Sequence, residues 1–218
     1  DIFEFRLLPG DRFSEGEIAT RMDVSRTPVR QALYRLEREG YLEVYFRSGW
    51  QVRPFDFQYF EELYELRIVL EVEAVRRLCE RPADQPTPLL DELKAIWSVP
   101  ATDYLSDGRQ VSALDERFHC QLVEAAGNRE MARIHADVSE KIRIIRRLDF
   151  TKVPRVEFTY QEHARILGAI FLRRYEEAQL LLRAHIEISK AEVRKITLHM
   201  LHVARERATP EKGDRHGS

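Results

Sequence analysis

The chain has 218 residues, of which 44% are hydrophobic and 33% are charged, and its formal net charge is −2. This composition is ordinary for a folded protein, and the charge argues against a protein that coats nucleic acid without sequence preference. No apolar run approaches the roughly 20 residues of a membrane helix, and we expect a cytoplasmic protein without a signal peptide. Cys79 and Cys120 lack the spacing of a disulfide framework or a thiolate metal site, and we expect both to be small buried hydrophobic residues.

Two short helices joined by a turn are predicted near the N-terminus. The segment Ser14–Glu17 has the capping-box pattern and begins a helix that runs to about Met22. After a turn at residues 23–25, a second helix of about three turns is capped by Thr27 and ends before Gly40. This arrangement is a helix-turn-helix.

The second of these helices has two distinct faces. An apolar stripe at helical spacing predicts contact with a core and consists of Val29, Ala32, Leu33 and Leu36. The other face is polar and carries Thr27, Arg30, Gln31, Tyr34 and Arg38. Guanidinium, amide and hydroxyl groups near a helix N-terminus can enter a DNA major groove, although a merely solvated helix has the same pattern. Residues 21–53 carry seven arginines against four acidic residues, which favours specific, salt-sensitive DNA contacts.

Period-two alternation after Gly40 predicts a hairpin. Its strands are Tyr41–Tyr45 and Trp50–Pro54, and its loop contains Arg47 and Ser48. A two-stranded wing beside a helix-turn-helix would place these two residues near a minor groove or a phosphate. Arg47 is equally compatible with an ordinary solvated loop residue.

From about Pro54 the apolar period is helical almost to the end of the chain. Helices are predicted at 57–81, 89–97, 112–127, 129–148, 158–174 and 175–205, with a polar, mobile segment at 99–109. The predicted fold is therefore mainly α, with a winged helix-turn-helix at 1–54, an all-α antiparallel bundle at 55–205 and a disordered tail at 206–218.

Arg67 lies on the apolar stripe of the first long helix, between Leu63 and Leu70. A guanidinium that faces a core needs an anion, because a buried unpaired charge is costly. Glu71, one turn later, is one candidate. The other is the carboxylate of a small ligand, bound by Arg67 in a forked geometry.

Three histidines and one aspartate are predicted to face the interior of the bundle. Asp115 and His119 share one helical face, and His163 and His185 lie on the inward stripes of two later helices. Imidazole and carboxylate ligands suit zinc, nickel, manganese or iron. The alternatives are a capping role for Asp115 and hydrogen-bonded core positions for the histidines.

The N-terminal motifs resemble the winged helix of the GntR family of bacterial transcription regulators. They are Leu8-Pro9-Gly10, Val24–Leu33, Leu36–Gly40 and the wing glycine Gly49. The resemblance implies DNA contacts by Ser25, Arg26, Thr27 and Arg30, with Ser48 and Gly49 in the wing. Gly16 departs from the pattern, since some relatives have an arginine there that reaches DNA. The chain opens at Asp1 within what resembles the end of the family's first helix, so we expect part of that helix to be missing.

The remaining motifs resemble the all-helical FCD-type effector domain of the FadR branch of this family. They are Leu66–Glu71, Leu114–His119, Ala126–Asn128, Glu162–Ile170 and Ala184-His185. The resemblance implies that Asp115, His119, His163 and His185 hold a divalent metal, foremost zinc or nickel and otherwise manganese or iron. It also implies open metal positions for a small organic acid, with Arg67 as a second clamp.

The expected function is that of a metabolite-responsive repressor that binds a palindromic double-stranded DNA operator as a homodimer, without enzyme activity or membrane attachment. Two alternatives remain. A metal-dependent, hydrolase-like enzyme would activate water at the metal, but no well-placed general base is evident beyond the ligands. An architectural DNA-binding protein would have the same bundle and no effector.

Overall fold

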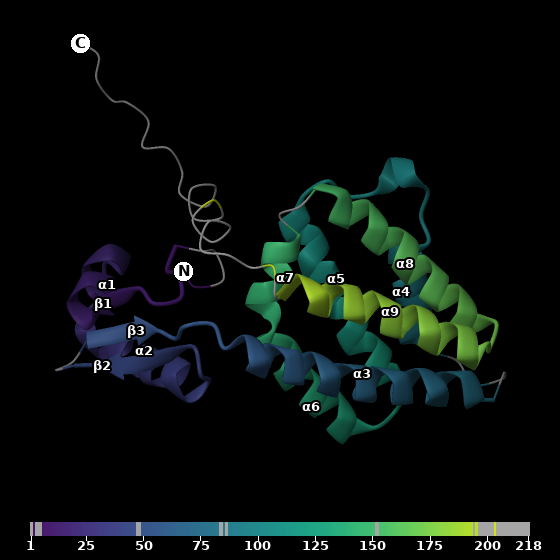
Figure 1. The fold of residues 1–218 in the computed structure, drawn as a ribbon, viewed down its shortest axis with the longest axis horizontal. Helices are drawn as coiled ribbons and strands as arrows, with labels where there is room; N and C mark the ends of the chain where they lie inside the picture. Colours follow the sequence, from purple (N-terminus) through teal and green to yellow (C-terminus); the bar gives the residue numbers. More distant parts are fainter. Residues whose placement is uncertain are drawn as a thin grey trace, which may run out of the picture. The chain divides into compact units, whose positions relative to one another are not determined.

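The computed structural model describes residues 2, 6–46, 49–82, 85, 87–150, 153–193, 195 and 203. The chain divides into two compact units, one built around Asp1–Asp56 and the other comprising Phe57–Ile196 (Figure 1). Among these described residues, the helices are too short or too polar to cross a membrane. The predicted tail at 206–218 lies outside the described residues.

The first unit combines two helices with a small sheet. Helices α1 (Glu15–Met22) and α2 (Arg26–Arg38) pack together, and the strands are β1 (Arg12–Ser14), β2 (Leu42–Tyr45) and β3 (Gly49–Val52). The sheet is antiparallel in the order β1-β3-β2. The buried core of this unit includes Leu8, Phe13, Ile18, Ala19, Val29, Leu33, Leu42, Trp50 and Val52. The helix-turn-helix and its two-stranded wing are confirmed, whereas β1 was not predicted because three residues are too few to show a period.

The helix ends of this unit follow local chemistry. In the predicted capping box, the Glu17 amide donates to the Ser14 hydroxyl at 3.2 Å and the Ser14 amide donates to the Glu17 carboxylate at 2.6 Å. Gly40 follows α2 with a φ of +86°, which favours glycine.

Two expectations for α2 were wrong. The helix begins at Arg26 with Ser25 as N-cap, not at Pro28 with Thr27 as N-cap. Pro28 fits in the first turn because the amides there have no partner within the helix. Ala32 is exposed, so Val29 and Leu33 make the buried contacts of the stripe.

The second unit is a helical bundle. Its elements are α3 (Phe57–Glu80), α4 (Pro88–Trp97), the short 3₁₀ helix η2 (Ala101–Asp103), α5 (Gly108–Ala125), α6 (Arg129–Lys141), α7 (Arg143–Asp149), α8 (Val153–Phe171) and α9 (Tyr175–Val193). Helix α9 packs against both α3 and α8, and α5 contacts α3, α4 and α6 (Figure 1). The predicted all-α bundle is therefore confirmed.

Several predicted boundaries shift. Helix α5 begins at Gly108, where the Asp107 carboxylate caps the Arg109 amide at 2.9 Å, so Asp115 lies inside the helix and is not a cap. Helix α8 begins at Val153, earlier than predicted, and its first turn contains Pro154. The continuation of α9 toward residue 205 lies largely outside the described part of the chain.

The predicted helix 129–148 is divided at Ile142 into α6 and α7. The apolar period predicted that Ile134 faces inward. In the structure Ile134 is 37% exposed, and the adjacent His135 is fully buried. Cys79 is buried as expected, whereas Cys120 is partly exposed.

Candidate metal centre and DNA-binding surface

Four buried side chains meet inside the helical bundle. Asp115 and His119 come from α5, His163 from α8 and His185 from α9. One potential ligand atom of each residue lies within 4.8 Å of the others. The structure thus brings together all four residues that the sequence singled out, on the three helices expected.

Three of the distances between these atoms are close to those around a single tetrahedral ion. The Nε2 atom of His185 lies 3.2 Å from that of His119 and 3.4 Å from that of His163. Asp115 Oδ1 lies 3.3 Å from His163 Nε2. A tetrahedral ion with metal–nitrogen bonds of about 2.0–2.1 Å separates its ligand atoms by roughly 3.4 Å.

Two carboxylates orient the imidazoles from outside the cluster. Glu71 Oε2 lies 2.6 Å from His119 Nδ1, and Glu162 Oε2 lies 2.7 Å from His185 Nδ1. Burial raises the pKa of Glu71, but the charge of Arg67 and the hydrogen bonds with His119 and His135 outweigh it and hold this pKa well below its usual value. An ionised Glu71 accepts a hydrogen bond from the Nδ1–H of His119, which turns the Nε2 lone pair toward the centre.

The cluster therefore combines lone pairs that repel one another unless a cation is present. Burial lowers the pKa of His185 to about 4 and that of His163 well below its usual value, so both rings are neutral at pH 7. Asp115 Oδ1 is buried and forms no hydrogen bond within the described part of the chain, although His163 Nε2 lies 3.3 Å from it. Three imidazole nitrogens and one carboxylate oxygen form a donor set that fits a divalent metal ion.

Arginine side chains lie next to this cluster. Arg67 is buried, and its Nε donates to Glu71 Oε1 at 2.6 Å, so the ion pair considered from the sequence forms. Arg146 Nε lies 2.8 Å from Asp115 Oδ2. The buried atoms Arg67 Nη2 and Arg146 Nη2 have no hydrogen-bond partner among the described residues, whereas Arg146 Nη1 lies 3.3 Å from Glu116 Oε2.

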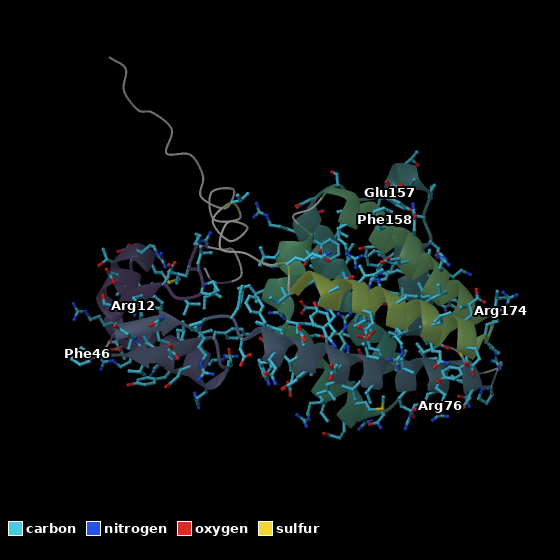
Figure 2. The ribbon with its side chains drawn as sticks, viewed as in Figure 1. Arg12, Phe46, Arg76, Glu157, Phe158 and Arg174 are labelled. Atoms are coloured by element: carbon cyan, nitrogen blue, oxygen red, sulfur yellow. The ribbon has the colours of Figure 1, made fainter. Side chains whose placement is uncertain are left out.

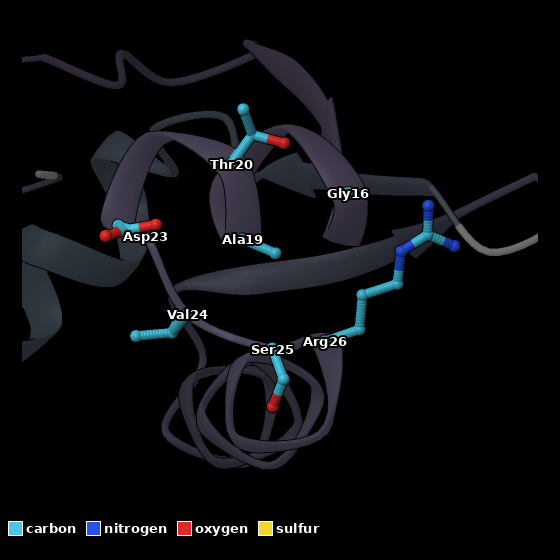
Figure 3. Close-up of a pocket in the computed structure, with 7 residues that line it drawn as sticks. All are labelled: Gly16, Ala19, Thr20, Asp23, Val24, Ser25 and Arg26. Atoms are coloured by element: carbon cyan, nitrogen blue, oxygen red, sulfur yellow. The ribbon is translucent and has the colours of Figure 1, made fainter.

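In the first unit, the predicted DNA-contacting residues gather at the start of α2. Ser25, Arg26, Thr27 and Arg30 are all exposed. Ser25 and Arg26 line an open pocket of about 520 Å³ together with residues of α1, and Figure 3 shows the Arg26 side chain beside Gly16. A Cβ atom on Gly16 would lie 3.3 Å from Arg26 Nη2, so the missing side chain leaves room for this guanidinium.

The wing is described only in part. Arg47 and Ser48 lie outside the described residues, and Gly49 is the first residue of β3. A Cβ atom on Gly49 would lie 2.8 Å from the Tyr45 carbonyl oxygen, so the hairpin requires glycine here. Phe46, labelled in Figure 2, ends the β2 side of the hairpin with its side chain 76% exposed.

Both units match known families. Residues 1–52 match the bacterial regulatory proteins of the gntR family, and residues 62–188 match the FCD domain. The chain belongs to the GntR family. It is therefore a DNA-binding transcriptional regulator with an effector domain, and not an enzyme, which removes the hydrolase alternative.

Relatives of this GntR regulator support the same architecture. The Nta operon transcriptional regulator of Aminobacter aminovorans is 34% identical over 185 residues, covering 85% of this chain and 84% of the relative. A solved GntR regulator from Rhodococcus sp. RHA1 has a TM-score of 0.70 at 22% identity, covering 89% of this chain and 92% of that chain. The metal-free FCD domain of the regulator TM0439 has a TM-score of 0.51 at 23% identity, covering 65% of this chain and 95% of that domain. FCD domains can bind metal.

Sequence reasoning missed several residues around the cluster of this GntR regulator. Two of these residues could have been found from their positions in the sequence. Glu162 directly precedes His163, and Arg146 follows the inward-facing Ile142 by one helical turn. His135 Nε2 donates to Glu71 Oε1 at 2.9 Å, although a histidine next to an apolar stripe gives no signal for burial. The partners of these side chains lie on other helices, as far as 64 residues away in the sequence, and only packing brings them together.

Proposed function

We propose that this GntR regulator is a metabolite-responsive repressor that binds a palindromic operator as a homodimer. In this proposal a small organic acid binds at a metal ion in the FCD bundle, and its binding releases the regulator from DNA. The observation that supports the proposal most strongly is the convergence of three buried imidazoles and one buried carboxylate oxygen in a chain that also carries a helix-turn-helix. Because the target is DNA, we place the proposed action in the cytoplasm.

The metal ligands in this proposal are Asp115, His119, His163 and His185. Three nitrogen donors and one oxygen donor favour zinc or nickel, with manganese and iron as less suited ions. The ion would supply a positive charge that attracts a carboxylate of the effector. The residues of this chain would orient the ligands through Glu71 and exclude bulk water through burial.

The Nη2 atoms of Arg67 and Arg146, which have no hydrogen-bond partner in the described part of the chain, support an anionic effector. Buried donors without a partner are costly, and a carboxylate would satisfy them with strong, charge-assisted hydrogen bonds. We assign Arg67 as the second clamp on the effector. Its pairing with Glu71 is compatible with this role because the Nη2 atom is not used in that pair.

The DNA contacts in this proposal are made by Ser25, Arg26, Thr27 and Arg30, with Arg47, Ser48 and Gly49 in the wing. A single recognition helix makes too small an interface for tight specificity, whereas two half-sites on a symmetric dimer multiply it. Effector binding would change DNA affinity through coupling of about 1–3 kcal/mol.

One experiment tests this function directly. The metal-loaded full chain is used to select duplexes from a randomised DNA library, and small mono-, di- and tricarboxylates are then screened for thermal stabilisation of the protein. We expect an acid that stabilises the protein to weaken its binding to the selected DNA. If every stabilising acid leaves DNA affinity unchanged, the architectural alternative is favoured. If no selected duplex shows two-fold symmetry, the dimeric operator is wrong.

A further inference from the structure

The Arg30 guanidinium is held by a carboxylate from another helix. Arg30 Nε lies 3.0 Å from both Oε1 and Oε2 of Glu15, and Arg30 Nη2 lies 2.9 Å from Glu15 Oε2. Arg30 is on α2 and Glu15 opens α1, so the pair joins the two helices of the helix-turn-helix.

Glu15 is the more buried member of this pair. Its side chain is 12% exposed, whereas that of Arg30 is 57% exposed. Glu15 lies between the two capping-box residues Ser14 and Glu17, in the first turn of α1. The N-terminus of a helix favours a negative charge at this position. The hydrogen bond from Arg30 lowers the pKa of Glu15, so the carboxylate is ionised at neutral pH.

The geometry leaves one edge of the guanidinium for a further contact. The hydrogen bonds of Arg30 within the described part of the chain use Nε and Nη2, on one side of the group. A guanine presents its O6 and N7 acceptors to the two terminal nitrogens of an arginine. Glu15 can therefore fix the plane of the guanidinium while Nη1 and the second Nη2 proton point to a base.

We propose that Glu15 is a positioning residue that sets the base preference of the contact made by Arg30, for a guanine in the major groove. This inference rests on the proposed DNA-binding role of Arg30. If the pair of Glu15 and Arg30 were only structural, its loss would have different effects. Exposed ion pairs contribute little to stability, and they have no influence on base preference. Glu15 also places a negative charge near the DNA, which lowers affinity for any sequence. Its neutralisation should therefore weaken specificity and strengthen non-specific binding at the same time.

The test compares the wild-type chain with E15Q, R30A and E17Q. Each protein selects duplexes from a randomised library, the bound DNA is sequenced, and affinity for random DNA is measured over a range of salt. We expect R30A to relax the preference at one base pair of each half-site by roughly 5- to 150-fold, the range for a bidentate arginine–base pair. E15Q should relax the same position by about tenfold and bind random DNA more tightly than wild type.

E17Q is the matched control, because it removes the same charge from the same helical turn while glutamine still satisfies a capping box. It should retain the wild-type preference. An E15Q/R30A double variant should match R30A, and circular dichroism checks that each variant is folded. If E15Q is poorly folded, E15D shifts the carboxylate while keeping its charge and should relax the same position. The inference is overturned if R30A relaxes a position that E15Q and E15D leave unchanged. If R30A relaxes none, the base-reading role of Arg30 falls as well.

Discussion

Glu71 is the side chain on which three others converge in the bundle. It accepts from Arg67 at 2.6 Å and lies 2.6 Å from His119 Nδ1 and 2.9 Å from His135 Nε2. A carboxylate with this many partners is held in one rotamer, and its hydrogen bond fixes the ring orientation of His119, a candidate metal ligand. At the scale of single residues, the candidate site therefore depends as much on Glu71 as on the ligands themselves.

Replacing Glu71 by glutamine should weaken metal binding by roughly 10- to 100-fold, because His119 loses the anion that orients its ring. The buried Arg67 would also lose its counter-ion, which costs about 3–5 kcal/mol of unfolding free energy. Chelator competition measures the first effect and denaturant unfolding the second. E73Q, which changes a half-buried carboxylate of the same helix, is the control, and a wild-type metal affinity in E71Q would contradict this role.

His163→Ala should remove bound metal, because it deletes one of the four proposed donors. Elemental analysis of the purified protein gives the stoichiometry directly. T159A is the matched control, since Thr159 is equally buried on α8 but its hydroxyl donates to the Arg155 carbonyl oxygen and it is not one of the four. An unchanged metal content in H163A would exclude His163 as a ligand.

At the scale of elements, the position of α5 is set by a close backbone contact. A Cβ atom on Gly108 would lie 2.3 Å from the Phe150 carbonyl oxygen, so the start of α5 can approach α7 only with glycine there. Helix α5 carries Asp115 and His119, and a shift at its first turn therefore reaches two of the proposed ligands.

Gly108→Ala should lower the unfolding free energy by about 1–3 kcal/mol, the usual cost of overpacking, and should weaken metal affinity as well. Denaturant unfolding and chelator titration measure the two effects. G168A provides the control in α8, because a Cβ atom there meets no atom within 4 Å and alanine favours a helix. A G108A variant as stable as G168A would show that the contact with Phe150 relaxes at no cost.

At the scale of the whole molecule, the proposed ion would tie α5, α8 and α9 together, while the first unit contributes none of the four ligands. Metal binding should therefore stabilise the bundle by linkage, by about 2.7 kcal/mol at a free metal concentration of 100 times the dissociation constant. Calorimetry of the chelator-treated and metal-reloaded protein measures this shift. H163A should lose the response, and an equal response in H163A would indicate that metal stabilises the protein at another site.

Much of this organisation could be predicted because it depends on local chemistry. The capping box at Ser14, the glycine at position 40 and the period of the long helices each follow from neighbouring residues. The start of α2 was misplaced because Pro28 is tolerated at several positions of a first turn. The division at Ile142 was missed because the apolar period continues through it.

The sequence by itself determined the helix-turn-helix with its wing, the helical bundle, and the inward faces that carry Asp115, His119, His163 and His185. Only the tertiary structure decided that Glu71 and Glu162 orient two of the imidazoles, that Arg146 reaches Asp115, and that Glu15 holds Arg30. The physical reason is range. Periodicity and capping act within one element and leave a pattern along the chain, whereas these polar contacts join different helices or widely spaced residues, and only packing selects which partners meet.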